Sequence, residues 1–250
     1  MSIELAGQRA LVTGGAQRVG RSIALALARR GMRVAIHYHS SRSEAEKTLA
    51  ELRAVAPDPL LLRADLADRS AARGLVDRAV GALGGLDLLV LSAANFERVV
   101  LGEIDDATWD RTLGLNLGSQ FAIAQQALPA LKASKGSMVF ITCSSATTPF
   151  RNHLPYVVAK GGLKHLMRTL ALEAAPEVRV NAVAPGTVLP PADLDPATVN
   201  RLAQTVPLGR TGQPDDVADA VVYLAGAPFV TGQEIKVDGG RAVAKIEHFG

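Results

Sequence analysis

Short apolar runs alternate along the chain with longer segments in which apolar residues recur every three or four positions. The runs predict seven strands, at Arg9–Thr13, Arg33–His37, Leu60–Arg63, Leu86–Leu91, Ser137–Thr142, Arg179–Val183 and Glu234–Val237. The periodic segments predict six helices, at Arg21–Arg30, Ser43–Ala56, Ala71–Leu83, Trp109–Lys132, Tyr156–Ala174 and Asp215–Leu224. Strand and helix therefore alternate from one end of the sequence to the other.

The predicted strands carry apolar residues at successive positions, as in RALVT, LDLLVL and SMVFIT. This pattern is typical of parallel strands covered on both faces. We therefore predict an α/β fold of one Rossmann-type domain over residues 1–250, with a doubly wound, parallel, seven-stranded sheet and helices on both faces. Its ligand cleft opens at the carboxyl ends of the strands. The Pro-containing stretch at about 186–207 is predicted to be an irregular loop that shapes the substrate pocket.

Composition narrows the kinds of partner. A chain of 250 residues with 48% hydrophobic residues can bury a large core, and its single cysteine excludes a disulfide scaffold or a Cys-based metal cage. The 27 Lys and Arg and the 24 Asp and Glu are scattered, so no nucleic-acid or membrane surface is indicated. No signal-peptide pattern or apolar run of membrane length is present. We expect a cytoplasmic protein with a small-molecule substrate.

The first predicted strand runs directly into Thr13-Gly14-Gly15-Ala16-Gln17-Arg18-Val19-Gly20, and a helical pattern follows. Glycines between a strand and a helix let the backbone approach a pyrophosphate at the helix N-terminus, so this turn predicts dinucleotide binding. Arg18 stands close to the point where such turns have their middle glycine. It is either a surface helix residue or a guanidinium beside the phosphates.

The end of the second predicted strand bears on which dinucleotide binds. NAD-binding sites usually have Asp or Glu there for the ribose 2′-OH, whereas this strand continues as His37-Tyr38-His39-Ser40-Ser41-Arg42-Ser43. The missing acid predicts NADP(H), with the 2′-phosphate bound by His39, Ser40, Ser41 and Arg42. Ser43 and Glu46 have capping-box spacing. The two histidines have no third ligand nearby, so no metal site is predicted.

Tyr156 and Lys160 are four residues apart at the start of the helix that follows the fifth strand. They share one helix face at the carboxyl edge of the sheet. An ammonium near a phenol favours the phenolate, so Lys160 is expected to lower the Tyr156 pKa from about 10 toward neutrality. Such a tyrosine can exchange a proton with a carbonyl or imine during hydride transfer.

These features together resemble the short-chain dehydrogenase/reductase family over the whole chain. The matching segments are Thr13–Gly20, Asp65-Leu66, Asn116, Tyr156-x-x-x-Lys160, Pro185-Gly186 and Thr231-Gly232-Gln233 with Val237-Asp238-Gly239-Gly240. The resemblance implies that Tyr156 is the general acid/base, that Lys160 binds the nicotinamide ribose, and that Asn116 holds a water in the proton relay. It also implies a homotetramer. The cofactor contacts that follow are Gly14, Gln17, Arg18, Val19, His39, Ser40, Ser41, Asp65, Leu66, Ser92, Ala93, Ala94, Tyr156, Lys160, Pro185, Gly186 and Val188.

The chain departs from the family pattern at two places. Leu91-Ser92-Ala93-Ala94-Asn95 replaces Asn-Asn-Ala-Gly after the fourth strand. The family's catalytic serine stands thirteen residues before the tyrosine, where this chain has Cys143, and Ser144 stands twelve before it. Either Ser144 serves or Cys143 takes the place; we assign catalysis to Ser144 and place Cys143 beside the substrate.

One subgroup of the family shares further residues with the chain. Arg18 and the His37-Tyr38-His39-Ser40-Ser41 run are similar to the pteridine reductases, in which an aromatic residue at the position of Phe96 stacks on the pterin. Phe96 is alternatively an aromatic at the edge of the core, and the subgroup's acid and serine are absent at Cys143 and Ala94. The resulting hypothesis is an NADPH-dependent reductase of a carbonyl or C=N group, with a pterin-like heterocycle as a candidate substrate. A 3-oxoacyl or other ketone is the alternative substrate, and a non-catalytic NADP-binding sensor or scaffold is the alternative of another class.

Overall fold

The seven strands of the computed structural model lie close to the predicted positions, and the structure describes residues 2–190 and 194–244. They are β1 Arg9–Thr13, β2 Arg33–Tyr38, β3 Leu60–Arg63, β4 Leu88–Leu91, β5 Ser137–Ile141, β6 Arg179–Pro185 and β7 Glu234–Val237. All pair in parallel, in the order β3-β2-β1-β4-β5-β6-β7. The single parallel sheet predicted from the apolar runs is confirmed.

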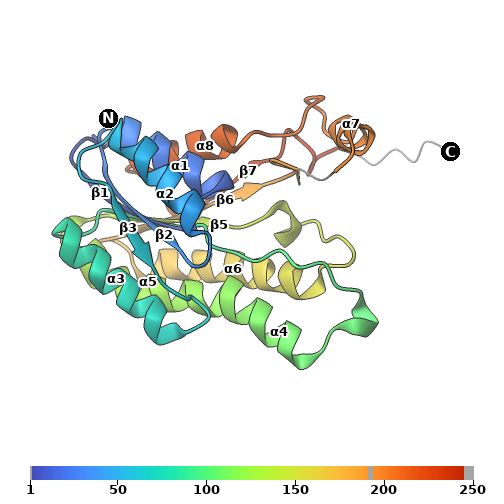
Figure 1. Cartoon of the computed structure of the whole chain (residues 1–250), viewed down its shortest axis with the longest axis horizontal. Helices are drawn as coiled ribbons and strands as arrows, with labels where there is room; N and C mark the ends of the chain where they lie inside the picture. Colours follow the sequence, from blue (N-terminus) through green and yellow to red (C-terminus); the bar gives the residue numbers. More distant parts are fainter. Residues whose placement is uncertain (1, 191–193, 245–250) are drawn as a thin grey trace.

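Helices cover both faces of this sheet (Figure 1). They are α1 Arg18–Arg29, α2 Arg42–Arg53, α3 Arg69–Leu83, α4 Asp106–Leu113, α5 Ser119–Ser134, α6 Leu154–Glu173, α7 Pro196–Gln204 and α8 Pro214–Gly226. One core lies between the sheet and α1, α2 and α8, and includes Ile23 and Val221. The other lies between the sheet and α3, α5 and α6, and includes Leu75 and Phe140. Each such fully buried apolar side chain stabilises the fold by about 2 kcal/mol.

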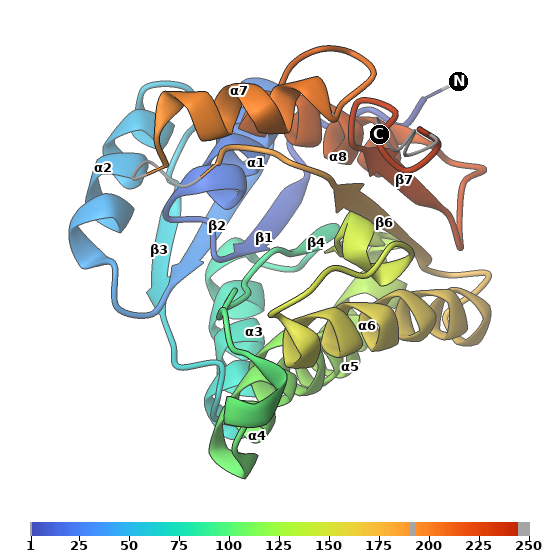
Figure 2. The ribbon, with the colours of Figure 1, turned by 90° about the vertical axis from the view of Figure 1, so that its right-hand side faces the viewer.

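The parallel arrangement brings the segments that follow β1, β4, β5 and β6 to the same edge of the sheet. Thr13 and Leu91, the last residues of β1 and β4, are paired, and Leu91 pairs with Phe140 next to the end of β5, so the neighbouring strands end at about the same level. The start of α6 lies on this side of the molecule together with α4 and α7 (Figure 2). The glycine turn and the Tyr156–Lys160 pair are therefore neighbours in space although they are about 140 residues apart.

Three local predictions are corrected. The helix predicted at Trp109–Lys132 is α4, a π-helical turn at Gly114–Gly118, and α5, because the buried side chain of Asn116 in that turn is bonded outside the helix. The predicted capping box is wrong, since α2 begins at Arg42 and Glu46 bonds to Arg42.

The stretch predicted to be an irregular loop contains α7. The Asp195 carboxylate accepts the Thr198 N–H at 2.9 Å, and Pro196 occupies the first helical position. Both are helix-start signals. Pro191, within the same predicted loop, lies outside the described residues. No helix in residues 2–190 and 194–244 is long and apolar enough to span a membrane.

Candidate active site

The glycine turn after β1 leads directly into the N-terminus of α1 at the carboxyl edge of the sheet. Gly14 has a φ of +65°, and a Cβ there would lie 2.9 Å from the Cα of Ala93, so only glycine fits. The first turn of α1 contains no acidic residue, and within the described chain the Gln17 side chain makes no capping hydrogen bond. Unpaired N–H groups at a helix N-terminus attract anions. This helix N-terminus therefore fits a pyrophosphate, and the cofactor contacts of Gly14, Gln17 and Val19 stay predictions.

Arg18 adopts a φ of +53°, the conformation that a glycine usually takes. Its Nη2 donates a hydrogen bond of 2.8 Å to the carbonyl of Leu189. Arg18 is therefore more than a surface helix residue, because it joins the glycine turn to the loop after β6. Its contact with a phosphate stays a prediction.

The segment after β4 is held against the glycine turn. The Thr13 hydroxyl oxygen accepts the N–H groups of Ser92 and Ala93 at 3.0 and 3.1 Å. Gln120 donates to the Ala93 carbonyl at 2.9 Å. Ser92 and Ala93 thus lie beside Gly14, as the cofactor prediction requires, and Ala94 is exposed next to them.

The residues after β2 form an exposed polar group beside the turn after β3. His39, Ser40 and Arg42 are exposed, and the His39 Nε2 lies 3.8 Å from an Asp65 carboxylate oxygen. The Arg42 guanidinium binds Glu46 at 2.8 Å. Ser41 precedes the first turn of α2.

Two neighbouring side chains are buried. Leu66 is 2% exposed and packs in the core, so its side chain is not available to an adenine. His37 is 3% exposed, and its ring nitrogens bond to backbone groups of Gly14 and Ala64 inside the protein.

Tyr156 and Lys160 lie in the first turns of α6 and are both buried. The Lys160 Nζ donates a 2.8 Å hydrogen bond to the Ile141 carbonyl, at the end of β5. It also lies 5.6 Å from the centroid of the Tyr156 ring. The predicted pair is therefore assembled, with the lysine fixed by the strand and not free in solution.

The expected lowering of the Tyr156 pKa is wrong for this structure. Burial raises the pKa of the phenol, and the neighbouring Cys143 raises it further. Burial also lowers the pKa of Lys160 to about 8. The physical reason is that moving a charged phenolate from water into the protein interior costs more free energy than its attraction to the Lys160 ammonium recovers. Tyr156 is thus a neutral phenol, which suits a proton donor.

The structure places Cys143 at the tyrosine. Cys143 lies close enough to the Tyr156 side chain to raise the pKa of its phenol. The Cys143 sulfur accepts the Ser145 N–H at 3.4 Å. Ser144 is the first residue of a 3₁₀ turn, Ser144–Ala146. The catalytic role assigned to Ser144 stays a prediction, and this geometry does not support it.

Asn116 braces the segment after β4 from the π-helical turn. Its side chain is fully buried, and its amide donates to the Asn95 carbonyl at 3.2 Å and to the Asn95 side chain. Its side-chain oxygen accepts the Asn95 N–H at 3.2 Å. Both ends of the amide are bonded to Asn95, and the role of Asn116 in holding a relay water stays a prediction. The contact between Asn95 and Asn116 could not be predicted from the sequence, because it depends on the geometry of the π-helical turn.

An aromatic cluster borders Tyr156. Phe96 is 59% exposed, stacks on the His153 ring at 4.1 Å with an interplanar angle of 10°, and meets Tyr156 edge-on at 4.8 Å. Phe150 meets both Phe96 and His153 edge-on. Phe96 is therefore not a core-edge aromatic, and one of its faces is covered by His153. The sequence reasoning missed His153 and Phe150, which stand outside any periodic pattern.

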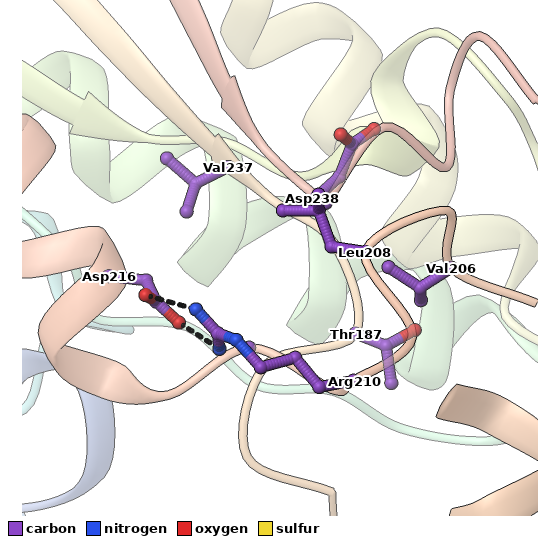
Figure 3. Close-up of a pocket in the computed structure, with 9 residues that line it drawn as sticks. Thr187, Val206, Leu208, Arg210, Asp216, Val237 and Asp238 are labelled. Atoms are coloured by element: carbon purple, nitrogen blue, oxygen red, sulfur yellow. Dashed lines mark hydrogen bonds and ion pairs between the residues drawn. The ribbon is translucent and has the colours of Figure 1, made fainter. Parts of the chain in front are cut away.

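The loop after β6 is fixed at its base. Gly186 donates to the Val237 carbonyl at 2.9 Å, and Val188 pairs with Gly212. A cavity of about 100 Å³ lies beneath the loop, and Figure 3 shows the Arg210–Asp216 ion pair at its wall. This cavity is lined from β7, α8 and the loop, without the catalytic pair, so it is a packing gap of the loop base.

Residues 2–190 and 194–244 contain no cluster of side chains that could bind a metal ion. Among those residues no group of three or more His, Cys, Asp or Glu side chains is arranged to hold an ion.

A doubly wound parallel sheet, a glycine turn at an α1 N-terminus and a buried Tyr–Lys pair at the carboxyl edge define a nucleotide-dependent oxidoreductase. Residues 14–242 match the family model described as Enoyl-(Acyl carrier protein) reductase. The chain belongs to the short-chain dehydrogenase/reductase family.

Individual relatives can be aligned with nearly the whole chain. It is 39% identical to a protein described as a ketoacyl reductase of the granaticin polyketide synthase of Streptomyces violaceoruber, over 92% of this chain and 94% of that protein. It is 34% identical to a 3-oxoacyl-(acyl-carrier-protein) reductase of Staphylococcus aureus, over 92% and 96%. A solved short-chain dehydrogenase/reductase from Serratia marcescens superposes with a TM-score of 0.90 at 31% identity, over 96% and 100%.

Proposed function

We propose that the protein is an NADPH-dependent reductase that reduces a ketone in a small molecule. The observation that carries this proposal is the neutral, buried Tyr156 phenol beside Lys160 at the edge where the glycine turn lies. A phenol with a raised pKa is protonated at neutral pH, and the alkoxide formed when a carbonyl accepts hydride is a base strong enough to take that proton. The resting form of Tyr156 is therefore the form that carbonyl reduction uses.

Different residues of the chain bind the cofactor and transfer the proton. Bound NADPH would supply the hydride. The first turn of α1 binds its pyrophosphate, Gly14 lets the backbone pass close to it, and His39, Ser40 and Ser41 bind its 2′-phosphate. Tyr156 gives its proton to the carbonyl oxygen, Cys143 lies beside the same phenol, and Lys160 binds the nicotinamide ribose and returns a proton toward the tyrosine.

Two observations favour a ketone over a pterin. The relatives described above are ketoacyl and 3-oxoacyl reductases. The face of Phe96 toward His153 is already stacked, so a flat heterocycle has at most one face of that ring. Reduction of a pterin-like C=N group stays a prediction.

The test is a screen of NADPH oxidation with a 3-oxoacyl thioester, a bicyclic aromatic ketone and oxidised and dihydro pterins. We expect turnover of at least one ketone and slow or no turnover of pterins. Faster pterin turnover would contradict the ketone assignment. Tight NADPH binding without any turnover would instead favour the NADP-binding sensor.

Cofactor choice gives the first mutational prediction. Ser40→Asp places a carboxylate beside the predicted 2′-phosphate site, and like charges repel. We expect the ratio of kcat/KM for NADPH to that for NADH to fall at least tenfold, or about 1.4 kcal/mol. Steady-state kinetics with both cofactors measures it. Ser43→Asp, one turn further into α2, is the control; an unchanged ratio for Ser40→Asp would contradict the site.

The aromatic cluster gives a prediction on substrate shape. Phe96→Ala removes an exposed ring beside Tyr156, so we expect KM for a bicyclic aromatic ketone to rise about tenfold and KM for a linear 3-oxoacyl thioester to change by less than threefold. Phe229→Ala, an exposed phenylalanine between α8 and β7, is the control. Equal losses with both substrates would contradict a stacking role.

The exposed apolar residues on α5 and α6 bear on assembly. Phe121, Leu154, Val158 and Leu172 are exposed and form apolar surface on these two helices. Such surface is consistent with the expected homotetramer.

A further inference from the structure

His37 joins two loops that belong to the proposed cofactor site. It lies in β2 and is 3% exposed. Its Nδ1 accepts the Gly14 N–H at 3.1 Å, and its Nε2 lies 3.1 Å from the Ala64 carbonyl oxygen. The imidazole therefore bridges the glycine turn after β1 to the segment after β3.

The two partners permit a single form of the ring. A backbone N–H can only donate, so Nδ1 must carry a lone pair, and a carbonyl can only accept, so Nε2 must carry the hydrogen. A doubly protonated ring would turn an N–H toward the Gly14 N–H. Burial lowers the pKa of His37 to about 4, with His39 and Arg78 lowering it and Asp65 and the Ala64 carbonyl raising it. The neutral ring is thus the form present at neutral pH.

The backbone around His37 reinforces the same bridge. The His37 carbonyl accepts the Gly15 N–H at 3.0 Å, and the Tyr38 carbonyl accepts the Ala64 N–H at 3.1 Å. On the other side, Gly14 packs against Ala93. The position of the glycine turn relative to Asp65, the residue after Ala64, is therefore set by β2 backbone bonds together with the His37 side chain, which bonds to both segments.

We propose that His37 is a positioning residue for the dinucleotide, which fixes the distance between the pyrophosphate-binding turn and the adenosine-binding segment. This inference rests on the proposed NADPH binding. His37 touches no cofactor itself, because both ring nitrogens are occupied by the protein. It acts by keeping the Gly14 amide and the Asp65 segment in the arrangement that both halves of the cofactor need.

The experiment compares dissociation constants for NADPH and for adenosine 2′,5′-bisphosphate, measured by titration calorimetry on the whole protein. The variants are His37→Leu, which removes both bonds, His37→Asn, which keeps an acceptor near Gly14, and His37→Gln, which keeps a donor near Ala64. Asn181→Leu is the matched control, since Asn181 is buried and bonds two backbone groups, Val230 O and Gln233 N, in β6 away from the site.

We expect His37→Leu to weaken NADPH binding about tenfold, with kcat at saturating NADPH within twofold of the native value. His37→Asn should recover most of the affinity, and Asn181→Leu should lower the melting temperature without changing the dissociation constant. If His37→Leu does not fold, native-like NADPH affinity in His37→Asn together with weaker binding in His37→Gln supports the bridge.

Several results would overturn the inference. Unchanged affinity in His37→Leu, equal losses in kcat and affinity, or no recovery in His37→Asn each contradict a positioning role. If the native protein binds no NADPH, the proposed function fails and the inference fails with it. If the native protein binds NADPH tightly and the His37 variants bind it equally tightly, the inference fails and the proposed function stands.

Discussion

Tyr156→Phe is expected to lower kcat for NADPH-dependent ketone reduction by about 10³-fold, within the 10²–10⁴ range that a positioned proton donor supplies. The substitution removes only the hydroxyl oxygen. The ring still packs against Phe96 and beneath the Lys160 ammonium, so the site keeps its shape. The proton for the alkoxide must then come from water, which the buried position of Tyr156 keeps out.

The measurement is single-turnover NADPH oxidation together with calorimetric NADPH binding. The dissociation constant should stay within threefold of the native value, because the hydroxyl is not needed to hold the phosphates. Tyr223→Phe is the matched control, since Tyr223 is 58% exposed on α8. Native-like turnover in Tyr156→Phe would contradict the mechanism.

Cys143→Ala is expected to lower kcat about 10- to 100-fold. Loss of a hydrogen-bond donor to a developing oxyanion costs about 10²–10³-fold, and a thiol is a weaker donor than a hydroxyl, so the loss here is smaller. Cys143→Ser should equal or exceed native kcat because it installs the stronger donor at the contact with Tyr156.

Ser144→Ala is the paired variant that separates the two candidates for the serine role. We expect a change of less than threefold, because the structure places Cys143 and not Ser144 against the phenol. Steady-state kcat for the four proteins decides the matter. A large loss in Ser144→Ala with little loss in Cys143→Ala would return the role to Ser144.

The strands and most helices could be predicted from the sequence because their signals are local. The continuous apolar runs of β1, β4 and β5 reflect burial on both faces of a parallel sheet. The break in the helix at Asn116 left no such signal, since a single π-helical turn of five residues is too short to show a period of its own. The start of α7 did carry a cap signal at Asp195, which the prolines of the stretch obscured.

The candidate site was predicted to the level of residue type and position along the chain. Tyr156, Lys160 and Gly14 lie at the carboxyl edge because every parallel strand ends there. The charge states of the pair were not predictable in the same way. Proximity alone suggested a lowered Tyr156 pKa, whereas the burial of both groups, which the sequence does not express, raises it.

The sequence by itself determined the alternation of strand and helix, the glycine turn, the absence of an acid after β2 and the spacing of Tyr156 and Lys160. These are properties of neighbouring residues, so local periodicity and steric preference are enough to express them. Only the tertiary structure decided that Cys143 meets Tyr156, that His153 covers a face of Phe96 and that His37 is buried between two loops. These contacts join separate segments, and their geometry and desolvation exist only once the sheet and its two helical layers have packed.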